Sequence, residues 1–328
     1  MGKKSSRKKE NKSRIDLDNN LTFEALLENI IAEYMQVTLV PGGKLERGPV
    51  KDSNGNECIT LRALCHFNEG CPRNFSEFLV SVMENGQQGI GRREAFAWWA
   101  RSRLRYSCST IAVSLYKFVV PSLNSIGISQ LRSVTLNKFI KLENFEIYSL
   151  GFIPKETQVI ELTSACSHPR TEIVQPVLPY GGGYPPHCSH NFIKCKESGS
   201  IIDCALGQFL GTMKPYIFND MDEFLHQIPG DVLYYFKTKQ DEIEQQAERD
   251  SAKFRSRVSP DSIPSKFSQR VLRSCNEKKG YCWNCKGIST IGTDLKTCKR
   301  CNDAKYCSRD CQQLHWKSHK LVCNSTQH

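Results

Sequence analysis

The C-terminal segment from residue 282 to residue 323 concentrates side chains that bind soft metal ions. Two Cys-x2-Cys pairs come first, at Cys282/Cys285 and Cys298/Cys301. A Cys-x3-Cys pair and a His-x3-Cys pair complete the set, with Cys307, Cys311, His319 and Cys323. Cysteines separated by two residues can present both thiolates from one tight turn to a tetrahedral Zn2+, with bonds of ~2.3 Å to sulfur. The eight ligands predict two four-coordinate ions with no open position, which is typical of structural zinc.

The residues around these ligands predict a final helix and a segment that depends on its metal. Ser308 is a favourable N-cap, and Asp310 follows in the first turn. Cys311, His315 and His319 are then four residues apart, so they share one helical face. The segment has few large apolar side chains besides its cysteines, and so small a core rarely folds alone. Bound zinc supplies ~10–16 kcal/mol per site in small fingers, so we expect the metal to be required for folding.

The order and spacing of these ligands resemble a MYND-type zinc finger over residues 282–323. The likeness includes the tyrosine directly before Cys307, the first cysteine of the third ligand pair, and the tryptophan of the final helix. The resemblance implies interleaved sites. One zinc would bind Cys282, Cys285, Cys307 and Cys311, and the other would bind Cys298, Cys301, His319 and Cys323. Spacing alone leaves sequential pairing open. His315 stands where the family usually has a non-ligand, so we exclude it from both sites.

The resemblance also implies a protein-interaction module, because some such fingers bind short proline-rich peptides. Gln312 and Trp316 match the polar and aromatic positions of the peptide groove, one helical turn apart. An exposed tryptophan can stack on proline rings. The alternative is that Trp316 only covers the second zinc ion. Lys299 departs from the small polar residue at the matching position of peptide-binding relatives, which disfavours an apolar peptide or favours an acidic one.

Composition limits the compartment and the partners. The chain has 328 residues and 16 cysteines, and it shows no secretory signal or apolar stretch long enough to span a membrane. We therefore expect an intracellular protein, of the cytoplasm or nucleus, with reduced thiols. The net charge of +11 is concentrated at the two ends of the chain. Zinc-bound thiolates lower the positive charge of the finger, so nucleic acid is not expected as the main partner. The oligomeric state is left open.

The expected fold class is α+β, with a mainly helical N-terminal domain and a small C-terminal two-zinc finger. Four segments divide the chain: a disordered basic tail at 1–19, a globular domain of unknown family at 20–244, a charged helical or linker segment at 245–277, and the finger at 278–328. Apolar periodicity predicts helices at 23–34, 75–83, 92–106, 221–226 and 231–257, and short strands within 144–162. The charged, proline-containing linker predicts that the finger is independent of the domain.

Two classes of function remain. The first is a zinc-dependent adaptor or regulatory protein that binds a protein partner. The second is an enzyme with its active site within residues 20–240 and the finger as a targeting module. A SET-type methyltransferase is disfavoured, because only five residues follow Cys323 and no Asn-His-Cys motif is present. The central region holds further cysteines and histidines, most densely in His187-Cys188-Ser189-His190. A further metal site or a Cys–His nucleophile pair there stays open, and no catalytic residue is assigned.

Overall fold

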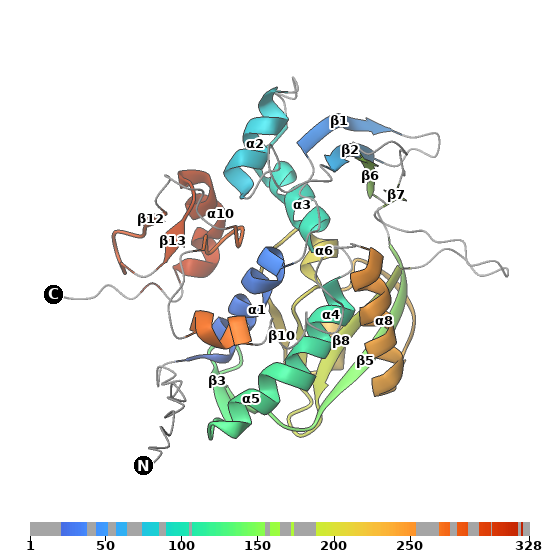
Figure 1. Ribbon diagram of the computed structural model, residues 1–328, viewed down its shortest axis with the longest axis vertical. Coiled ribbons are helices and arrows are strands. Elements are labelled where there is room, and N and C mark those ends of the chain that lie inside the picture. Colours follow the sequence, from blue (N-terminus) through green and yellow to red (C-terminus); the bar gives the residue numbers. More distant parts are fainter. Residues whose placement is uncertain are drawn as a thin grey trace, which may run out of the picture.

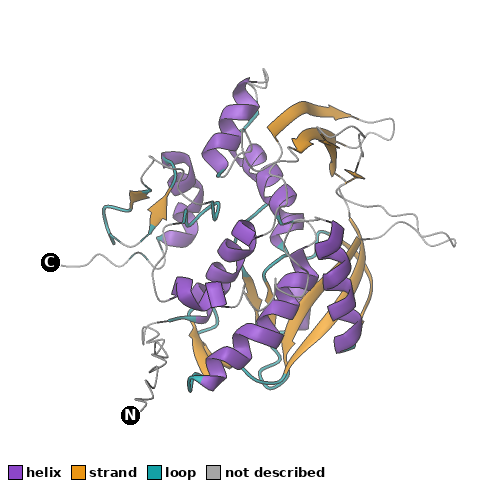
Figure 2. Cartoon of the chain, viewed as in Figure 1, coloured by secondary structure: helices purple, strands orange, loops and turns teal. Residues whose placement is uncertain are grey.

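The computed structural model describes most of the chain. The described residues are 21–37, 44–51, 57–63, 74–84, 90–104, 107–154, 158–164, 172–173, 188–253, 269–275, 281–287, 295–302, 304–320 and 323. The basic tail expected at 1–19 lies outside them. Helices and strands both contribute to the N-terminal part, and the finger follows at the C-terminal end (Figure 1 and Figure 2). The α+β class is therefore confirmed.

Three helices pack in the N-terminal part of the chain as the apolar pattern predicts. They are α1 (Phe23–Val37), α2 (Phe75–Glu84) and α3 (Arg92–Arg103). The apolar face of α1 is buried, and Trp98 and Trp99 of α3 have no exposed surface. Phe78 of α2 packs on Trp99 with ring centroids 5.6 Å apart. These aromatic side chains are core residues, as expected from the sequence.

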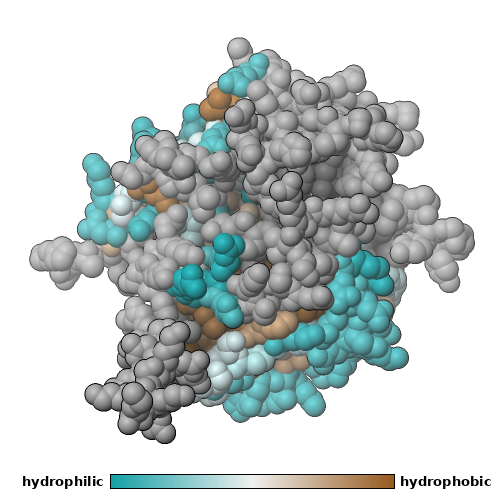
Figure 3. All heavy atoms as spheres, viewed as in Figure 1, coloured by the Kyte–Doolittle hydropathy of each residue, from teal (hydrophilic) through white to brown (hydrophobic). Residues whose placement is uncertain are grey.

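A longer helical run follows, and it was not predicted as a helix. It comprises α4 (Ser107–Ser114), the π-helical turn η1 (Leu115–Val119) and α5 (Val120–Ser125). All eight residues of α4 are buried, because it contacts both the sheet and the amphipathic helix α8 (Gln240–Lys253). Ile243 and Ala247 are the buried apolar residues of α8. Figure 3 shows that the outer surface around α8 is hydrophilic.

Strands form two larger sheets. A five-stranded antiparallel sheet has the order β10-β9-β8-β5-β11, and its strands are β10 (Tyr216–Phe218), β9 (Ile201–Asp203), β8 (Cys188–Cys195), β5 (Phe145–Pro154) and β11 (Gly230–Lys237). A four-stranded sheet has the order β1-β2-β6-β7, and its strands are β1 (Lys44–Lys51), β2 (Glu57–Ala63), β6 (Gln158–Ser164) and β7 (Glu172–Ile173). A hairpin joins β3 (Gln130–Ser133) to β4 (Lys138–Lys141).

The five-stranded sheet separates two apolar clusters. Ile147, Ile193 and Ile202 belong to the large cluster that contains α1 and α4. Their strand neighbours Phe152 and Phe192 belong to a second cluster, with α6 (Gly207–Leu210) and α7 (Met221–His226). Alternate residues of a strand point to opposite faces, so β5, β8 and β9 each contribute residues to both clusters.

Two expectations need correction. The helix expected over 231–257 begins only at Gln240, because residues 230–237 form the edge strand β11. Its run Val-Leu-Tyr-Tyr-Phe is rich in β-branched and aromatic residues, and a short apolar run does not distinguish a strand from a helix. The expectation of a mainly helical N-terminal domain is not confirmed, since the two larger sheets are a major part of it.

The finger lies against the N-terminal helices. Its helix α10 (Arg309–His319) contacts α2, and one continuous apolar cluster contains Trp99 together with Cys282 and Cys285 (Figure 1). The expectation of an independent finger is therefore at variance with the contacts. The helical residues 269–275 are also packed, with Val271 and Leu272 buried. The division of the chain at 245–277 stays a prediction.

Within the described parts of the chain, no helix combines the length and apolarity that crossing a membrane requires.

Candidate metal centres of the C-terminal finger

Two similar turns present the Cys-x2-Cys pairs. The backbone N–H of Lys286 donates to the carbonyl of Cys282 at 2.9 Å, and Asn302 donates to Cys298 at 2.8 Å. Each turn is closed by a residue in the left-handed region, with φ of 57° at Lys286 and 54° at Asn302. This backbone conformation is uncommon for residues other than glycine. The repeated geometry brings the two sulfurs of each pair to the same side of its turn.

The helix α10 supplies the remaining ligands together with the strand before it. A short hairpin pairs β12 (Lys296–Thr297) with β13 (Lys305–Tyr306), and Cys307 follows directly. The hydroxyl of Ser308 accepts a hydrogen bond from the N–H of Cys311 at 3.2 Å, so Ser308 caps the helix as predicted. Asp310 lies in the first turn of α10.

The eight predicted ligands converge as two groups of four. The first contains Cys282, Cys285, Cys307 and Cys311, and the second contains Cys298, Cys301, His319 and Cys323. Within each group the ligand atoms all lie within 4.8 Å of one another. Ligand pairs of the two groups alternate along the sequence, which is the interleaved arrangement that the resemblance implies. The sequential arrangement would have joined Cys285 to Cys298.

The distances within both groups fit a tetrahedral zinc ion. In the first group, Cys307 Sγ lies 3.7 Å from Cys285 Sγ and 3.5 Å from Cys311 Sγ. In the second, His319 Nε2 lies 3.3 Å from Cys298 Sγ and 3.6 Å from Cys301 Sγ. Bonds of ~2.3 Å to sulfur and ~2.0 Å to nitrogen give tetrahedral edges of roughly 3.5–3.8 Å. Thiolate and imidazole are donors that zinc prefers, and four donors leave no position for a substrate.

His315 belongs to neither group. Its Nδ1 lies 3.0 Å from the hydroxyl of Tyr306, and its ring stacks on His319 with centroids 6.0 Å apart. Burial, followed by the nearby positive charge of Lys286, lowers the pKa of His315 to about 3. The neutral ring can therefore accept a hydrogen bond from the Tyr306 hydroxyl, and it packs beside the second group.

The predicted partner-binding residues lie on α10. Trp316 is 40% exposed, while its ring centroid is 5.9 Å from that of the ligand His319. The tryptophan thus touches the second metal group and also presents aromatic surface to solvent. Gln312 is half-buried, one turn before Trp316. Lys299 is exposed.

The first metal group is joined directly to α2 and α3. The indole Nε1 of Trp99 donates to the carbonyl of Cys285 at 3.5 Å, and Ser76 Oγ lies 3.5 Å from Cys307 Sγ. Arg92 forms an ion pair with Asp310 at 2.7 Å. Sequence reasoning treated Trp99 only as a core residue. A buried indole N–H needs an acceptor, and that requirement was the available signal for a polar contact.

A second set of contacts joins the finger to α1. Lys286 is buried, forms an ion pair with Glu28, and donates to the carbonyl of Trp283 at 2.6 Å. The hydroxyl of Tyr281 donates to Asn29 Oδ1 at 3.2 Å. Removal of either partner would leave a charge uncompensated at a buried position, so we expect the loss of Glu28 or Lys286 to weaken the docked arrangement.

The central cysteines and histidines form no further metal group among the residues that the structure describes. Cys188 is buried, and burial raises the pKa of its thiol to about 11. The imidazole Nε2 of His190 lies 2.5 Å from the carboxylate of Asp203. His187, His66 and His168 lie outside the described residues.

Comparison with known proteins identifies the finger. Residues 282–323 match the family model described as MYND finger, and this segment is a MYND-type finger with two zinc-binding clusters. The chain is 24% identical over 136 residues to the protein CBFA2T2 of Xenopus laevis, a match that covers 40% of this chain and 22% of that relative. It is 44% identical over 47 residues to a hypoxia-inducible factor prolyl hydroxylase of Caenorhabditis elegans, over 14% of this chain and 6% of the relative. The chain thus spans about a fifth or less of these relatives. No solved structure matches the chain.

Proposed function

We propose that this protein is an adaptor or regulatory protein that binds a protein partner through the finger. The observation that carries the proposal is Trp316, a 40% exposed aromatic side chain on a metal-stabilised helix. Both metal groups have four ligands, so the zinc ions support the fold of the finger and carry no reaction. Exposed tryptophans are enriched among the side chains that dominate binding energy.

The ligand that fits this surface best is a proline-rich peptide with acidic residues. The Trp316 ring offers a flat face for a proline ring, and Gln312 offers hydrogen-bonding groups one turn away. Lys317 and Lys320 are exposed on or directly after the same helix, and Lys299 is exposed on the second Cys-x2-Cys turn. These lysines favour carboxylates beside the prolines. Nucleic acid is not proposed as the main partner, and the compartment proposed is the cytoplasm or nucleus.

The test is the affinity of the full chain for synthetic proline-rich peptides with and without flanking acidic residues. Trp316→Ala should weaken binding by ~2 kcal/mol or more, as truncation of an aromatic anchor does. The variant should keep both zinc ions. Phe139→Ala is the matched control, because Phe139 is 59% exposed on β4 and far in sequence from the finger. Unchanged peptide binding by a zinc-loaded Trp316→Ala protein would remove the groove hypothesis.

One observation favours the alternative, an enzyme that the finger directs to its target. Within residues 20–240, the imidazole of His190 lies 2.5 Å from the carboxylate of Asp203, and both side chains are buried. Perturbed ionisable groups of this kind concentrate at active sites.

A further inference from the structure

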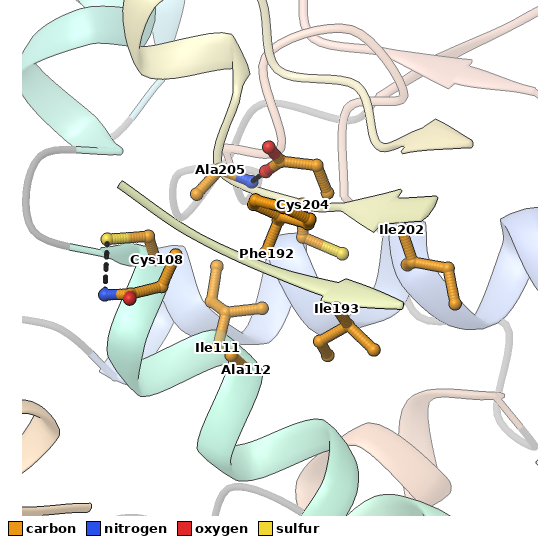
Figure 4. Close-up of a pocket in the computed structure, with 10 residues that line it drawn as sticks. Cys108, Ile111, Ala112, Phe192, Ile193, Ile202, Cys204 and Ala205 are labelled. Carbon is orange, nitrogen blue, oxygen red and sulfur yellow. Dashed lines mark hydrogen bonds between the residues drawn. The ribbon is translucent and has the colours of Figure 1, made fainter. Parts of the chain in front are cut away.

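Two of the cavities in the described part of the chain lie against the five-stranded sheet, and they differ in what they can admit. Figure 4 shows the smaller one, between α4 and the strands β8 and β9, with Cys108, Phe192 and Cys204 among its lining residues. Its volume of about 10 Å3 has room for at most one water molecule. The larger one has a volume of about 420 Å3, which is in the range of small-molecule sites. Of these two cavities, only the larger can therefore take a ligand.

The larger cavity lies at one end of the sheet, where β5 begins and where β8 and β11 end. Backbone hydrogen bonds fix its rim. The N–H of Lys196 donates to the carbonyl of Asn144 at 3.1 Å, and the N–H of Thr238 donates to the carbonyl of Ile147 at 2.9 Å. These bonds hold the residues that follow β8 and β11 beside the start of β5. The cavity opens to solvent, because Lys196 and Lys239 on its rim are exposed.

Tyr116 forms part of the cavity wall, and it comes from the π-helical turn η1. Its hydroxyl donates to Glu244 of α8 at 2.8 Å, and Glu244 also forms an ion pair with Lys117, so the position of the ring is fixed. Phe145 and the buried Ile147 add apolar surface to the wall. π-Helical turns are rare, and they occur frequently at functional sites. The cavity therefore offers an apolar surface to the organic part of a ligand.

Lysines predominate among the charged groups that line the cavity. They are Lys196, Lys237 and Lys239, and Glu146 is the one carboxylate among the lining residues that the structure describes. Lys237 donates to Glu146 at 2.8 Å. This hydrogen bond and, less strongly, the charge of Lys196 hold the pKa of Glu146 below its ordinary value, so the carboxyl is ionised. Three lysines and one carboxylate leave two positive charges at the cavity.

Two further carboxylates close in sequence to these lysines do not neutralise the cavity. Glu197 forms an ion pair with Lys141 of β4 at 2.7 Å. Glu242 lies 3.8 Å from Lys239, and both side chains are more than half exposed to solvent. An exposed pair of this kind contributes little energy, so Lys239 remains available to a ligand.

We propose that this cavity binds a small organic dianion, either a phosphate monoester or a dicarboxylate, with an apolar body. The two negative charges match the two positive charges left at the cavity, with Lys196 and Lys239 as the contacting cations. Asn144 and Gln240 also line the cavity, and each side-chain amide has an N–H beyond the one that it donates to a glutamate. The ring of Tyr116 contacts the apolar body. The inference does not depend on the partner of the finger.

The test is a titration of the zinc-loaded full chain with phenyl phosphate and, separately, with phthalate, followed by saturation-transfer difference NMR. Both probes carry two negative charges on one aromatic ring at about pH 7.5, because the second pKa of a phosphate monoester is about 6. Benzenesulfonate has the same ring and one negative charge. We expect at least one dianion to bind at millimolar concentration or below, about tenfold more tightly than benzenesulfonate. The dianion that binds more tightly identifies the anionic group. Failure of both dianions to bind, or equally tight binding of benzenesulfonate, would overturn the proposal.

Substitution of the two contacting lysines locates the binding site. Lys196→Gln and Lys239→Gln should each weaken dianion binding about fivefold, because each removes a positive charge that lies against the ligand. Both lysines are exposed, so the variants should keep the fold. Lys138→Gln is the matched control, since it removes one charge from β4 that does not line the cavity, and it should bind as wild type does. A dianion that binds the Lys196→Gln/Lys239→Gln double variant as tightly as wild type would overturn the assignment.

Discussion

Trp99 of α3 donates its indole N–H to the carbonyl oxygen of Cys285, at 3.5 Å, and so connects the core of the N-terminal part to the first metal group. The neighbouring contact between Ser76 and Cys307 reaches the same group from α2. The residues that would hold this zinc ion are thus part of the interface with the helices. Loss of the metal must then affect the packing of Trp99 and the stability of the domain.

Zinc removal should destabilise more than the finger. We expect chelation to lower the melting temperature of the whole chain, because the apolar cluster around Trp99 continues into Cys282 and Cys285. Calorimetry with and without chelator measures this effect. Trp99→Phe keeps an aromatic ring but loses the N–H donor, so it should reduce stability by roughly 1–3 kcal/mol. Two separate transitions, of which chelator removes only one, would contradict the coupling.

The helix cap should contribute to zinc affinity. Ser308→Ala removes the acceptor for the Cys311 N–H and should cost about 1 kcal/mol of α10 stability. Because α10 carries Cys311 and His319, the loss should appear as weaker binding of both zinc ions in competition with a chelator. Ser308→Asp retains a capping oxygen and should remain close to wild type. Equal zinc affinities for the alanine and aspartate variants would argue against this role.

The His190–Asp203 pair should make stability depend on pH. Since the pKa of His190 is raised from 6.5 to about 10 in the folded chain, its contribution is fully present below pH 6.5. The contribution is lost as the pH rises through 10. The free energy of unfolding, measured with urea between pH 6.5 and 10, should therefore fall more steeply for wild type than for His190→Gln. Parallel pH profiles for the two proteins would contradict a stabilising, protonated His190 in the folded chain.

The sequence predicted the finger better than the rest of the chain, for physical reasons. Ligand spacing restricts the geometry of a metal site, so the eight ligands between Cys282 and Cys323 could be identified before the fold was known. Their division into two interleaved groups came from the family resemblance, because spacing alone left sequential pairing open. The period of α1 identified its buried face. The run from Val232 to Phe236 carried no usable period, and its place at a sheet edge depends on pairing with β5.

The buried pair of His190 and Asp203 could not be found from spacing, because the two residues lie on different strands. They are brought together by the pairing of β8 with β9. The density of cysteine and histidine near residue 190 was the visible signal.

The most direct test of the two-zinc finger is a crystal structure of the full chain with anomalous scattering recorded at the zinc absorption edge. We predict two zinc peaks per chain. One should be surrounded by Cys282, Cys285, Cys307 and Cys311, and the other by Cys298, Cys301, His319 and Cys323. A single peak, or a peak at which Cys282 and Cys285 meet Cys298 and Cys301, would contradict the account.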